Sequence, residues 1–356
     1  MTVQTPVAHE RRAPAHARHG ARRAVVVGSG AALLLALAWI SLFVGSGNIP
    51  AHRVVEILSA WAFGDLPPGS RETTELLILE RRIPRTLLAV VVGGALGLAG
   101  VVMQALTRNP LADPGLLGVN AGAYTAVVFG SAVMGTMIGM AHVWLAMLGA
   151  LVTAVVVYSI GTSGRMGGSP AKLVLTGVAI GAVLSGLSFA VTLAMPEVFD
   201  RVRYWSAGSF QSRSWDELTT VLPFLGLGLL IALVLPRALN ALGLGDDAAV
   251  ALGTRPAVIR IAGLGAVTLL CGAATAAAGP LSFIGLIVPH ALRMLLGPDH
   301  RWLVPLSLLA APVLMLSADI LARLIVASEL PAGVVTAFLG APVLIALTRR
   351  KAVREL

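Results

Sequence analysis

Long apolar runs separated by short polar segments form the pattern of this chain from residue 24 onward. Most runs are close to the length that an α-helix needs to cross a bilayer, about 20 residues. They lie at 24–44, 86–106, 116–135, 143–161, 173–195, 218–235, 259–278, 281–296, 302–320 and 334–347. The eighth and tenth are short for a bilayer and need flanking turns. The pattern predicts an all-α polytopic membrane protein with ten transmembrane helices between residues 24 and 348.

The composition favours the same class. Of 356 residues, 57% are hydrophobic and only 12% are charged, whereas a soluble domain has about 25% charged residues. An aromatic share of 5% and 39 glycines favour helices packed through small residues over a membrane β-barrel. The net charge of +9 could indicate nucleic acid, but the basic residues stand in short clusters at the ends of apolar runs. That arrangement is typical of membrane topology, so we expect a lipid bilayer and no nucleic acid as partner.

Basic residues also predict the orientation. If the N-terminus is cytoplasmic, Lys and Arg are more frequent in the cytoplasmic segments than in the external ones, as the positive-inside rule requires. The bias comes mostly from two basic tails, 1–23 and 349–356, so both termini are predicted to be cytoplasmic. Residues 1–23 lack apolar periodicity and are predicted to be disordered. A cleaved signal peptide is the alternative, but the run 24–44 is longer than a usual signal core.

A faint internal repeat relates the two halves of the chain. Gly93, Gly100, Pro110 and Gly118 recur at the same spacing as Gly272, Gly279, Pro289 and Gly297. The second and seventh spans, which carry the first members of each set, run in opposite directions in the predicted topology. Inverted repeats of this kind are common in transporters, although in a glycine-rich chain the matches could also be coincidence.

Motifs of catalysis do not occur. The sequence has no P-loop and neither H-E-x-x-H nor G-x-S-x-G, so we predict no catalytic residue, no metal site and no cofactor on this chain. Few ionisable residues of the predicted spans qualify as buried groups that could couple transport to an ion, namely Asp319 and Arg293. Asp319 and Arg323 are spaced i, i+4, which favours a local salt bridge over a proton relay. A stand-alone secondary transporter needs buried groups that can be neutralised, so that alternative is disfavoured.

The cytoplasmic loop 236–256 carries a short helical pattern. It consists of Gly245, Asp246, Asp247, Ala248, Ala249, Val250, Ala251, Leu252 and Gly253. An aspartate N-cap and a terminal glycine predict a helix of about two turns, far too short to span. Such a helix would lie across the inner surface, where a cytoplasmic partner could push on the membrane domain. A loop that happens to form a helical turn is the alternative.

The most distinctive motifs begin with RIPRT at 82–86 and RNPLADP at 108–114, joined by a glycine stripe that permits close helix contact. Others are YWSAGSF (204–210), GPLSFIGLIVPH (279–290), GPDHR (297–301), ELPAGVVTA (329–337) and GAP (340–342). In order and spacing these resemble the FecCD-type permeases, the membrane subunits of ABC importers for iron-siderophores, haem and vitamin B12. The resemblance extends from Arg82 to the C-terminus.

This resemblance implies a permease in the bacterial cytoplasmic membrane that translocates an iron-siderophore-type chelate, with haem or cobalamin as the alternative cargo. It implies a homodimer or a heterodimer with a related permease. It also implies two cytoplasmic ATPase subunits, which bind ATP and Mg, and an external substrate-binding protein. The helix 245–253 would then be the coupling helix seated on the ATPase.

Two further sets of residues follow from the same resemblance. Arg82 and Arg85, with Arg323, match external arginines that grip acidic residues of the binding protein; topological or headgroup anchoring is the alternative. The fifth span would line the translocation pathway through Gly177, Gly181, Ser185 and Ser188. Helix packing is the alternative for that face of small residues.

Overall fold

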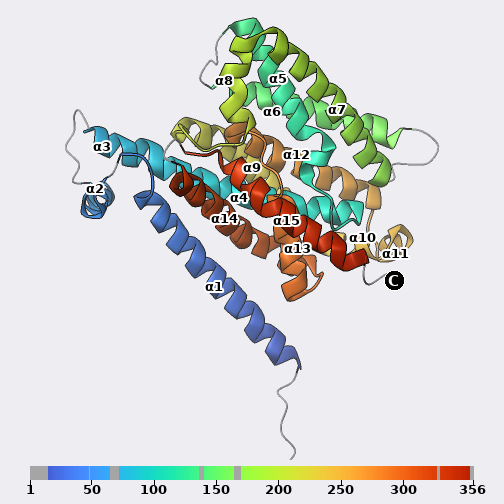
Figure 1. Cartoon of the computed structure of the whole chain (residues 1–356). Helices are drawn as coiled ribbons and strands as arrows, with labels where there is room; N and C mark the ends of the chain where they lie inside the picture. The colour runs from blue at the N-terminus through green and yellow to red at the C-terminus, as the bar shows by residue number, and fades with distance from the viewer. Residues whose placement is uncertain are drawn as a thin grey trace, which may run out of the picture.

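The computed structural model describes residues 15–47, 49–64, 72–135, 140–163, 170–326 and 329–352, and these residues form helices and connecting segments without a strand (Figure 1). The helices are α1 (Ala15–Phe43), α2 (Ala51–Phe63), α3 (Thr73–Leu76), η1 (Leu77–Arg82), α4 (Ile83–Thr107), η2 (Pro114–Leu117), α5 (Val119–Met134), α6 (Ala141–Thr162), α7 (Pro170–Ala194), α8 (Pro196–Ser206), α9 (Trp215–Val234), α10 (Pro236–Gly243), α11 (Asp246–Ala251), α12 (Pro256–Ala278), α13 (Ile284–Leu296), α14 (His300–Ile325) and α15 (Ala332–Ala352). The all-α class is confirmed.

Each predicted span coincides with a helix. In the described residues, seven helical stretches are long and apolar enough to cross a membrane, and α5, α13 and residues Ala332–Ala346 of α15 are shorter apolar helices. The prediction of one continuous helix over 116–135 is wrong at its start, because Gly118 adopts φ +74° and separates η2 from α5. The count of ten spans and the cytoplasmic position of both termini stay predictions.

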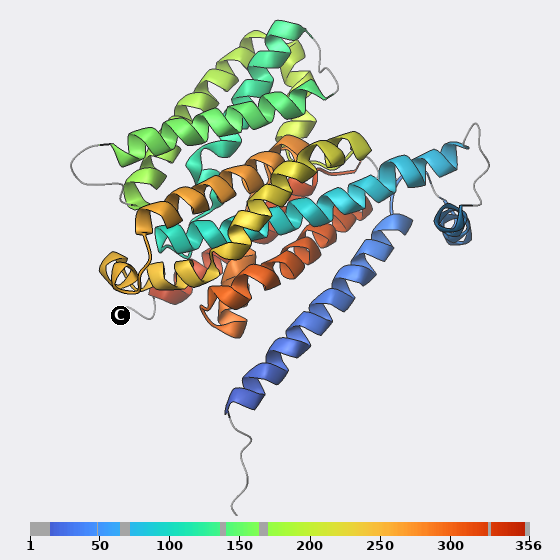
Figure 2. The same cartoon turned by 180° about the vertical axis from the view of Figure 1, so that it is seen from behind.

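Helix α4 is the centre of the bundle. In its most apolar stretch 83% of residues are buried, against 6% for α1 at the periphery. It packs against α9, α12, α13 and α14, and Figure 2 shows it running between α12 and α14. The predicted close contact along its glycine stripe is confirmed: a Cβ atom at Gly97 would lie 2.4 Å from Cβ of Ala311, and one at Gly100 would lie 1.9 Å from the carbonyl oxygen of Gly285.

Helix α1 begins at Ala15, so the prediction of a disordered tail up to residue 23 is wrong for its last part. Alanine and arginine, which dominate this segment, are strong helix formers, so the helix continues outward from the apolar run. Residues 1–14 of that predicted tail lie outside the described part of the chain, as do residues 353–356 of the second tail.

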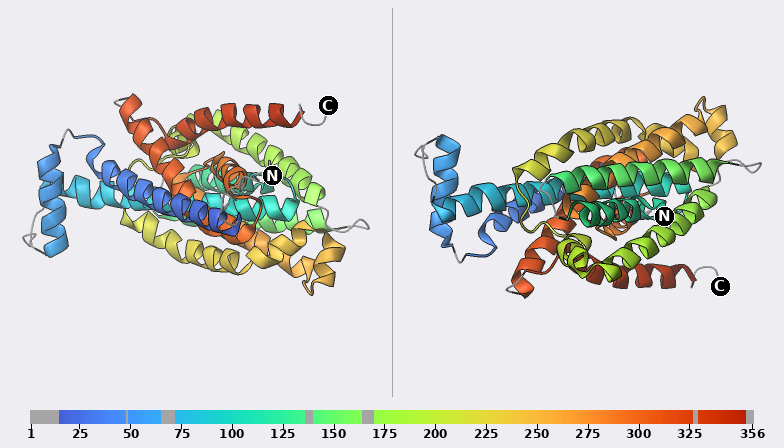
Figure 3. Two further views of the ribbon diagram at one scale, coloured as in Figure 1. Left: turned by 90° about the horizontal axis from the view of Figure 1, so that it is seen from below. Right: turned by 90° about the horizontal axis from the view of Figure 1, so that it is seen from above.

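The helices α5, α6, α7 and α8 form a second layer on one side of this core (Figures 1 and 3). The outer face of α7 is apolar and open in the single chain, since only 11% of its most apolar stretch is buried. Two ends of the bundle are defined in Figures 1 and 3: one carries α2 and α3, and the other carries α10, α11 and the end of α15. We refer to these as the α2 end and the α11 end.

Candidate functional site

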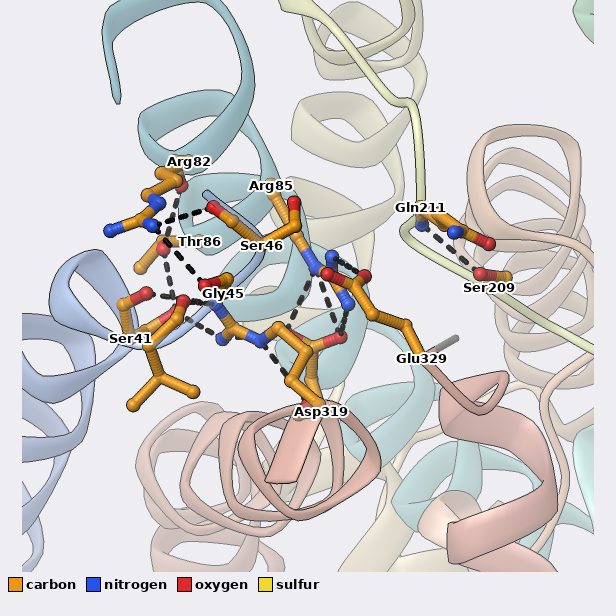
Figure 4. Close-up of polar contacts among 12 residues, drawn as sticks. Ser41, Gly45, Ser46, Arg82, Arg85, Thr86, Ser209, Gln211, Asp319 and Glu329 are labelled. Carbon is orange, nitrogen blue, oxygen red and sulfur yellow. Dashed lines mark hydrogen bonds and ion pairs between the residues drawn. The ribbon is translucent and has the colours of Figure 1, made fainter. Parts of the chain in front are cut away.

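The three predicted docking arginines lie in one cluster at the α2 end, and Figure 4 shows Arg82 and Arg85 there with Asp319 and Glu329. Arg82 and Arg85 lie where η1 passes into α4, and Arg323 lies in the last turn of α14. All three are buried, with exposed fractions of 6%, 9% and 8%. The structure therefore brings together the three residues, but it commits their guanidinium groups to partners within the chain.

Asp319 is the central carboxylate of this cluster. Its Oδ2 lies 2.9 Å from Nη2 of Arg323, which confirms the predicted i, i+4 pair. Its Oδ1 accepts a second bond of 2.9 Å from Nη2 of Arg85, a contact between α14 and α4. The Asp319 side chain is fully buried. A buried carboxylate needs compensating charge and hydrogen bonds, and two guanidinium groups provide both.

Glu329 is a member of the cluster that sequence reasoning missed. Its Oε2 lies 2.6 Å from Nη1 of Arg85, and its side chain is 10% exposed. The residue adopts φ +56°, a conformation uncommon for a residue with a side chain. Its only signal in the sequence was its place at the start of the ELPAGVVTA motif.

Arg82 binds the end of α1. Its Nη1 donates to the carbonyl oxygen of Leu42 at 2.9 Å, and its Nη2 donates to that of Ser46 at 3.0 Å. Arg323 contacts the same helix end through a 2.9 Å bond from Nη1 to the carbonyl oxygen of Ser41. Cations are stabilising at a helix C-terminus because the last carbonyl groups lack intrahelical partners. These arginines therefore fasten α1 to α4 and α14.

A cavity of about 240 Å³ opens beside the cluster. Arg81, Arg82, Arg85, Arg213 and Arg323 line it, and among its described lining residues Glu329 is the one carboxylate. Sequence reasoning missed Arg81 and Arg213. Arg81 is exposed and donates from Nη1 to the carbonyl oxygen of Ser212 at 2.8 Å. Asp319 and Glu217, which do not line the cavity, also pair with Arg85, Arg323 and Arg213. Five arginines against these three acids still leave an excess of positive charge, so the cavity suits an anionic group, and a carboxylate fits the planar fork of a guanidinium.

A second cavity, of about 480 Å³, lies between α5 and α7. Three of the four predicted pathway residues line it, namely Gly177, Gly181 and Ser185. Asn120, Tyr124 and Ser206 add polar atoms that sequence reasoning did not identify. None of the described residues that line this cavity is acidic or basic. The cavity can therefore offer hydrogen bonds without fixed charge.

The fourth predicted pathway residue, Ser188, lies away from this cavity. Its side chain is fully buried, and its Oγ is 2.9 Å from Oγ1 of Thr125 in α5. Gly177 also serves packing, because a Cβ atom there would lie 2.2 Å from the carbonyl oxygen of Leu116. The small face of α7 thus combines close helix contact with a cavity wall.

At the α11 end, the predicted short helix is present as α11, although it ends at Ala251. The prediction that Asp246 is its N-cap is wrong, since the N-cap is Gly245 and Asp246 is the first helical residue. The Asp246 carboxylate instead binds Arg108 and Arg260. Gly253 adopts φ +79° after the helix, as the predicted terminal glycine requires.

The short helix and its flanks expose apolar side chains. Leu244, Val250 and Leu252 are 70%, 59% and 63% exposed in the single chain. They lie outside the long apolar helices. Exposed aliphatic groups clustered in this way are typical of a surface that another protein covers.

Comparison with known proteins identifies the class. A family model of the FecCD transport family matches residues 33–350. The ferric enterobactin transport system permease protein FepD of Escherichia coli (strain K12) is 48% identical over 331 residues, which are 92% of this chain and 96% of that protein. The hemin transport system permease protein HmuU of Yersinia pestis is 40% identical over 285 residues, 77% of this chain and 83% of that protein.

A solved structure of a metal-chelate type ABC transporter in an inward-facing conformation has the same fold. It superposes with a TM-score of 0.77 at 27% identity, and covers 92% of this chain and 99% of that one. The helices, their order and these matches define a multi-pass membrane permease of the ABC importer type. The chain belongs to the FecCD transport family.

Proposed function

We propose that this chain imports an iron-siderophore-type chelate across the bacterial cytoplasmic membrane as the permease subunit of an ABC importer. The observation that carries this proposal is the 48% identity, over nearly the whole of both chains, to a permease named for ferric enterobactin. Haem is the alternative cargo, because a relative at 40% identity is named for hemin. The arrangement of α5 and α7 around an uncharged cavity of about 480 Å³ supports a pathway at Gly177, Gly181 and Ser185.

The energy source is a pair of cytoplasmic ATPase subunits that bind ATP and Mg. The segment Gly245 to Gly253 is the proposed coupling helix, and the exposed side chains of Leu244, Val250 and Leu252 supply an apolar surface for the ATPase. The permease itself pairs with a second copy or with a related permease. The open apolar face of α7 supports such pairing.

The arginine-lined cavity at the α2 end is the proposed docking site for an acidic side chain of the external binding protein. The buried Arg82, Arg85 and Arg323 line it together with the exposed Arg81. Because Arg85 is already paired with Glu329, an incoming carboxylate would compete with Glu329 for this guanidinium. The five arginines outnumber the three carboxylates that pair with them, Glu329, Asp319 and Glu217, and this excess of positive charge attracts such a partner.

Reconstitution in liposomes tests the function. The permease is assembled with the ATPase from the same organism, and uptake of radioactive iron is measured with ferric siderophores and with haem, each with its binding protein. We expect uptake of one ferric siderophore that requires ATP and the binding protein, together with stimulated ATP hydrolysis. Uptake that continues without the ATPase and stops when the ion gradient collapses would identify a secondary transporter instead.

A further inference from the structure

One carboxylate joins the short helix α11 to the centre of the bundle. Asp246, the first residue of α11, accepts bonds of 3.0 and 2.8 Å at its two oxygens from Nη2 of Arg260, near the start of α12. Its Oδ1 also binds Nη2 of Arg108, which follows the last residue of α4. Asp246 therefore contacts two different helices of the core at the same time.

Besides Asp246, Arg108 also binds the end of α10, the helix that precedes α11. The residue ends α4 in the left-handed conformation, with φ +50°, and its Nε donates to the carbonyl oxygen of Leu242 in α10 at 2.9 Å. One guanidinium thus binds the chain on both sides of Gly245. The conformation of Arg108 directs the end of α4 toward α10 and α11.

The rest of α11 is weakly attached. Among its residues only Ala249 is buried. Two glycines with positive φ flank it, Gly245 at +113° and Gly253 at +79°. Positions of this kind absorb changes in backbone angle easily and often serve as hinges. A force applied to α11 alone would therefore rotate the helix about these glycines unless another contact passed the force on.

The ion pairs of Asp246 with Arg108 and Arg260 are the contact that can transmit a force from α11 to the core. Partial burial by itself would raise the pKa of the Asp246 carboxyl, but hydrogen bonds from Arg260 and Arg108 outweigh it and lower the pKa. The carboxylate is thus ionised at neutral pH, and both guanidinium groups bind it with charge-assisted bonds. The helices that it reaches, α4 and α12, pack closely against each other within the core.

We propose that Asp246 is a positioning residue that couples displacement of α11 to α4 and α12 through Arg108 and Arg260. The inference rests on the proposed function, in which α11 receives the motion of the ATPase. Loss of the carboxylate leaves α11 able to bind the ATPase through its apolar side chains, but the displacement is then absorbed at Gly245 and Gly253. ATP hydrolysis and transport become uncoupled.

The test measures molecules of iron chelate transported per ATP hydrolysed in the reconstituted complex. We expect Asp246→Asn and Arg260→Gln each to lower this ratio by about fivefold or more, the range of a modest coupling free energy. Asp246→Glu should restore part of the ratio, because it keeps the charge within reach of both arginines. The matched control is Arg255→Gln, which should keep the wild-type ratio. Arg255 is an exposed arginine just before α12 and has no ion pair among the described residues, so this variant removes the same charge without breaking a contact.

A double variant separates coupling from general damage. If Asp246 and Arg260 act through each other, Asp246→Asn combined with Arg260→Gln should lose no more than the more affected single variant. Additive losses, or single variants with the wild-type ratio, would overturn the inference. So would loss of ATPase binding by Asp246→Asn in a pull-down, since Asp246 would then be needed for docking and not for transmission. A wild-type complex without stimulated hydrolysis would contradict the proposed function itself, and is thus a distinguishable result.

Discussion

Arg85 and Glu329 form an ion pair of 2.6 Å at the wall of the arginine-lined cavity, between the start of α4 and the segment that precedes α15. The same guanidinium holds the buried Asp319 on α14. The two acids differ in setting, because Asp319 is fully buried whereas Glu329 lines a cavity. Glu329 is thus the one of the two that an incoming carboxylate could replace.

Replacement of Glu329 by Gln should therefore strengthen docking. The variant removes the internal competitor for Arg85, so the affinity of the complex for the binding protein should rise by about twofold to tenfold, an effect of the size expected for one charge at an interface. Surface plasmon resonance or half-maximal stimulation of ATP hydrolysis measures it. Glu56→Gln is the control, because Glu56 is an exposed carboxylate of α2, paired with Arg53, and the charge change is the same. Unchanged or weaker binding by Glu329→Gln would show that the pair only supports the fold.

Substitution of Asp319 by Asn should act on stability. Removal of this carboxylate leaves the buried Arg323 without an acidic partner among the described residues and Arg85 with Glu329 alone, and breaking a buried pair in this way costs about 3–5 kcal/mol. Thermal unfolding of the purified permease in detergent measures the loss. Asp200→Asn, which breaks the exposed pair with Arg203, should have little effect, because surface pairs contribute about 0–1 kcal/mol. Equal melting temperatures of the two variants would contradict the central place of Asp319.

Local sequence rules predicted the parts of this structure that depend on neighbours along the chain. The apolar runs located the helices, and the i, i+4 spacing of Asp319 and Arg323 predicted their pair. The same rules could not predict that Arg85 and Glu329 join this pair. Arg85 lies more than two hundred residues before Glu329 in the sequence, and only the fold brings the two together. Nor could these rules exclude Asp246 as an N-cap, because Arg108 and Arg260, which bind its carboxylate, come from helices that only the fold brings near.

The glycines of α4 offer a graded test of helix packing. A Cβ atom at Gly100 would lie 1.9 Å from the backbone oxygen of Gly285, a distance that requires α13 to move. At Gly94 the nearest atom would be a Leu308 methyl carbon at 3.6 Å, an ordinary contact. We expect Gly100→Ala to lower the yield of folded permease and its unfolding temperature strongly, and Gly94→Ala to change both little. Size-exclusion chromatography and thermal unfolding provide the measurements, and equal behaviour of the two variants would refute the close approach of α4 and α13.

Ser185 provides a test of the pathway cavity that leaves the core of the bundle untouched. The residue is exposed in the single chain and lines the cavity of about 480 Å³ between α5 and α7. Ser185→Trp places an indole ring in this cavity and fills part of it, so the transport rate should fall by about tenfold or more. The binding protein should still dock at the α2 end. A tenfold change corresponds to about 1.4 kcal/mol in the barrier.

Leu35→Trp is the control for this substitution. Leu35 is 72% exposed on the peripheral helix α1 and does not line the cavity, so the added ring should leave transport within about twofold of wild type, as surface substitutions usually do. Uptake of radioactive iron by proteoliposomes measures both variants, and binding-protein affinity shows that each complex has assembled. If Ser185→Trp transports at the wild-type rate, the chelate crosses elsewhere and the cavity serves only the packing of α5 and α7.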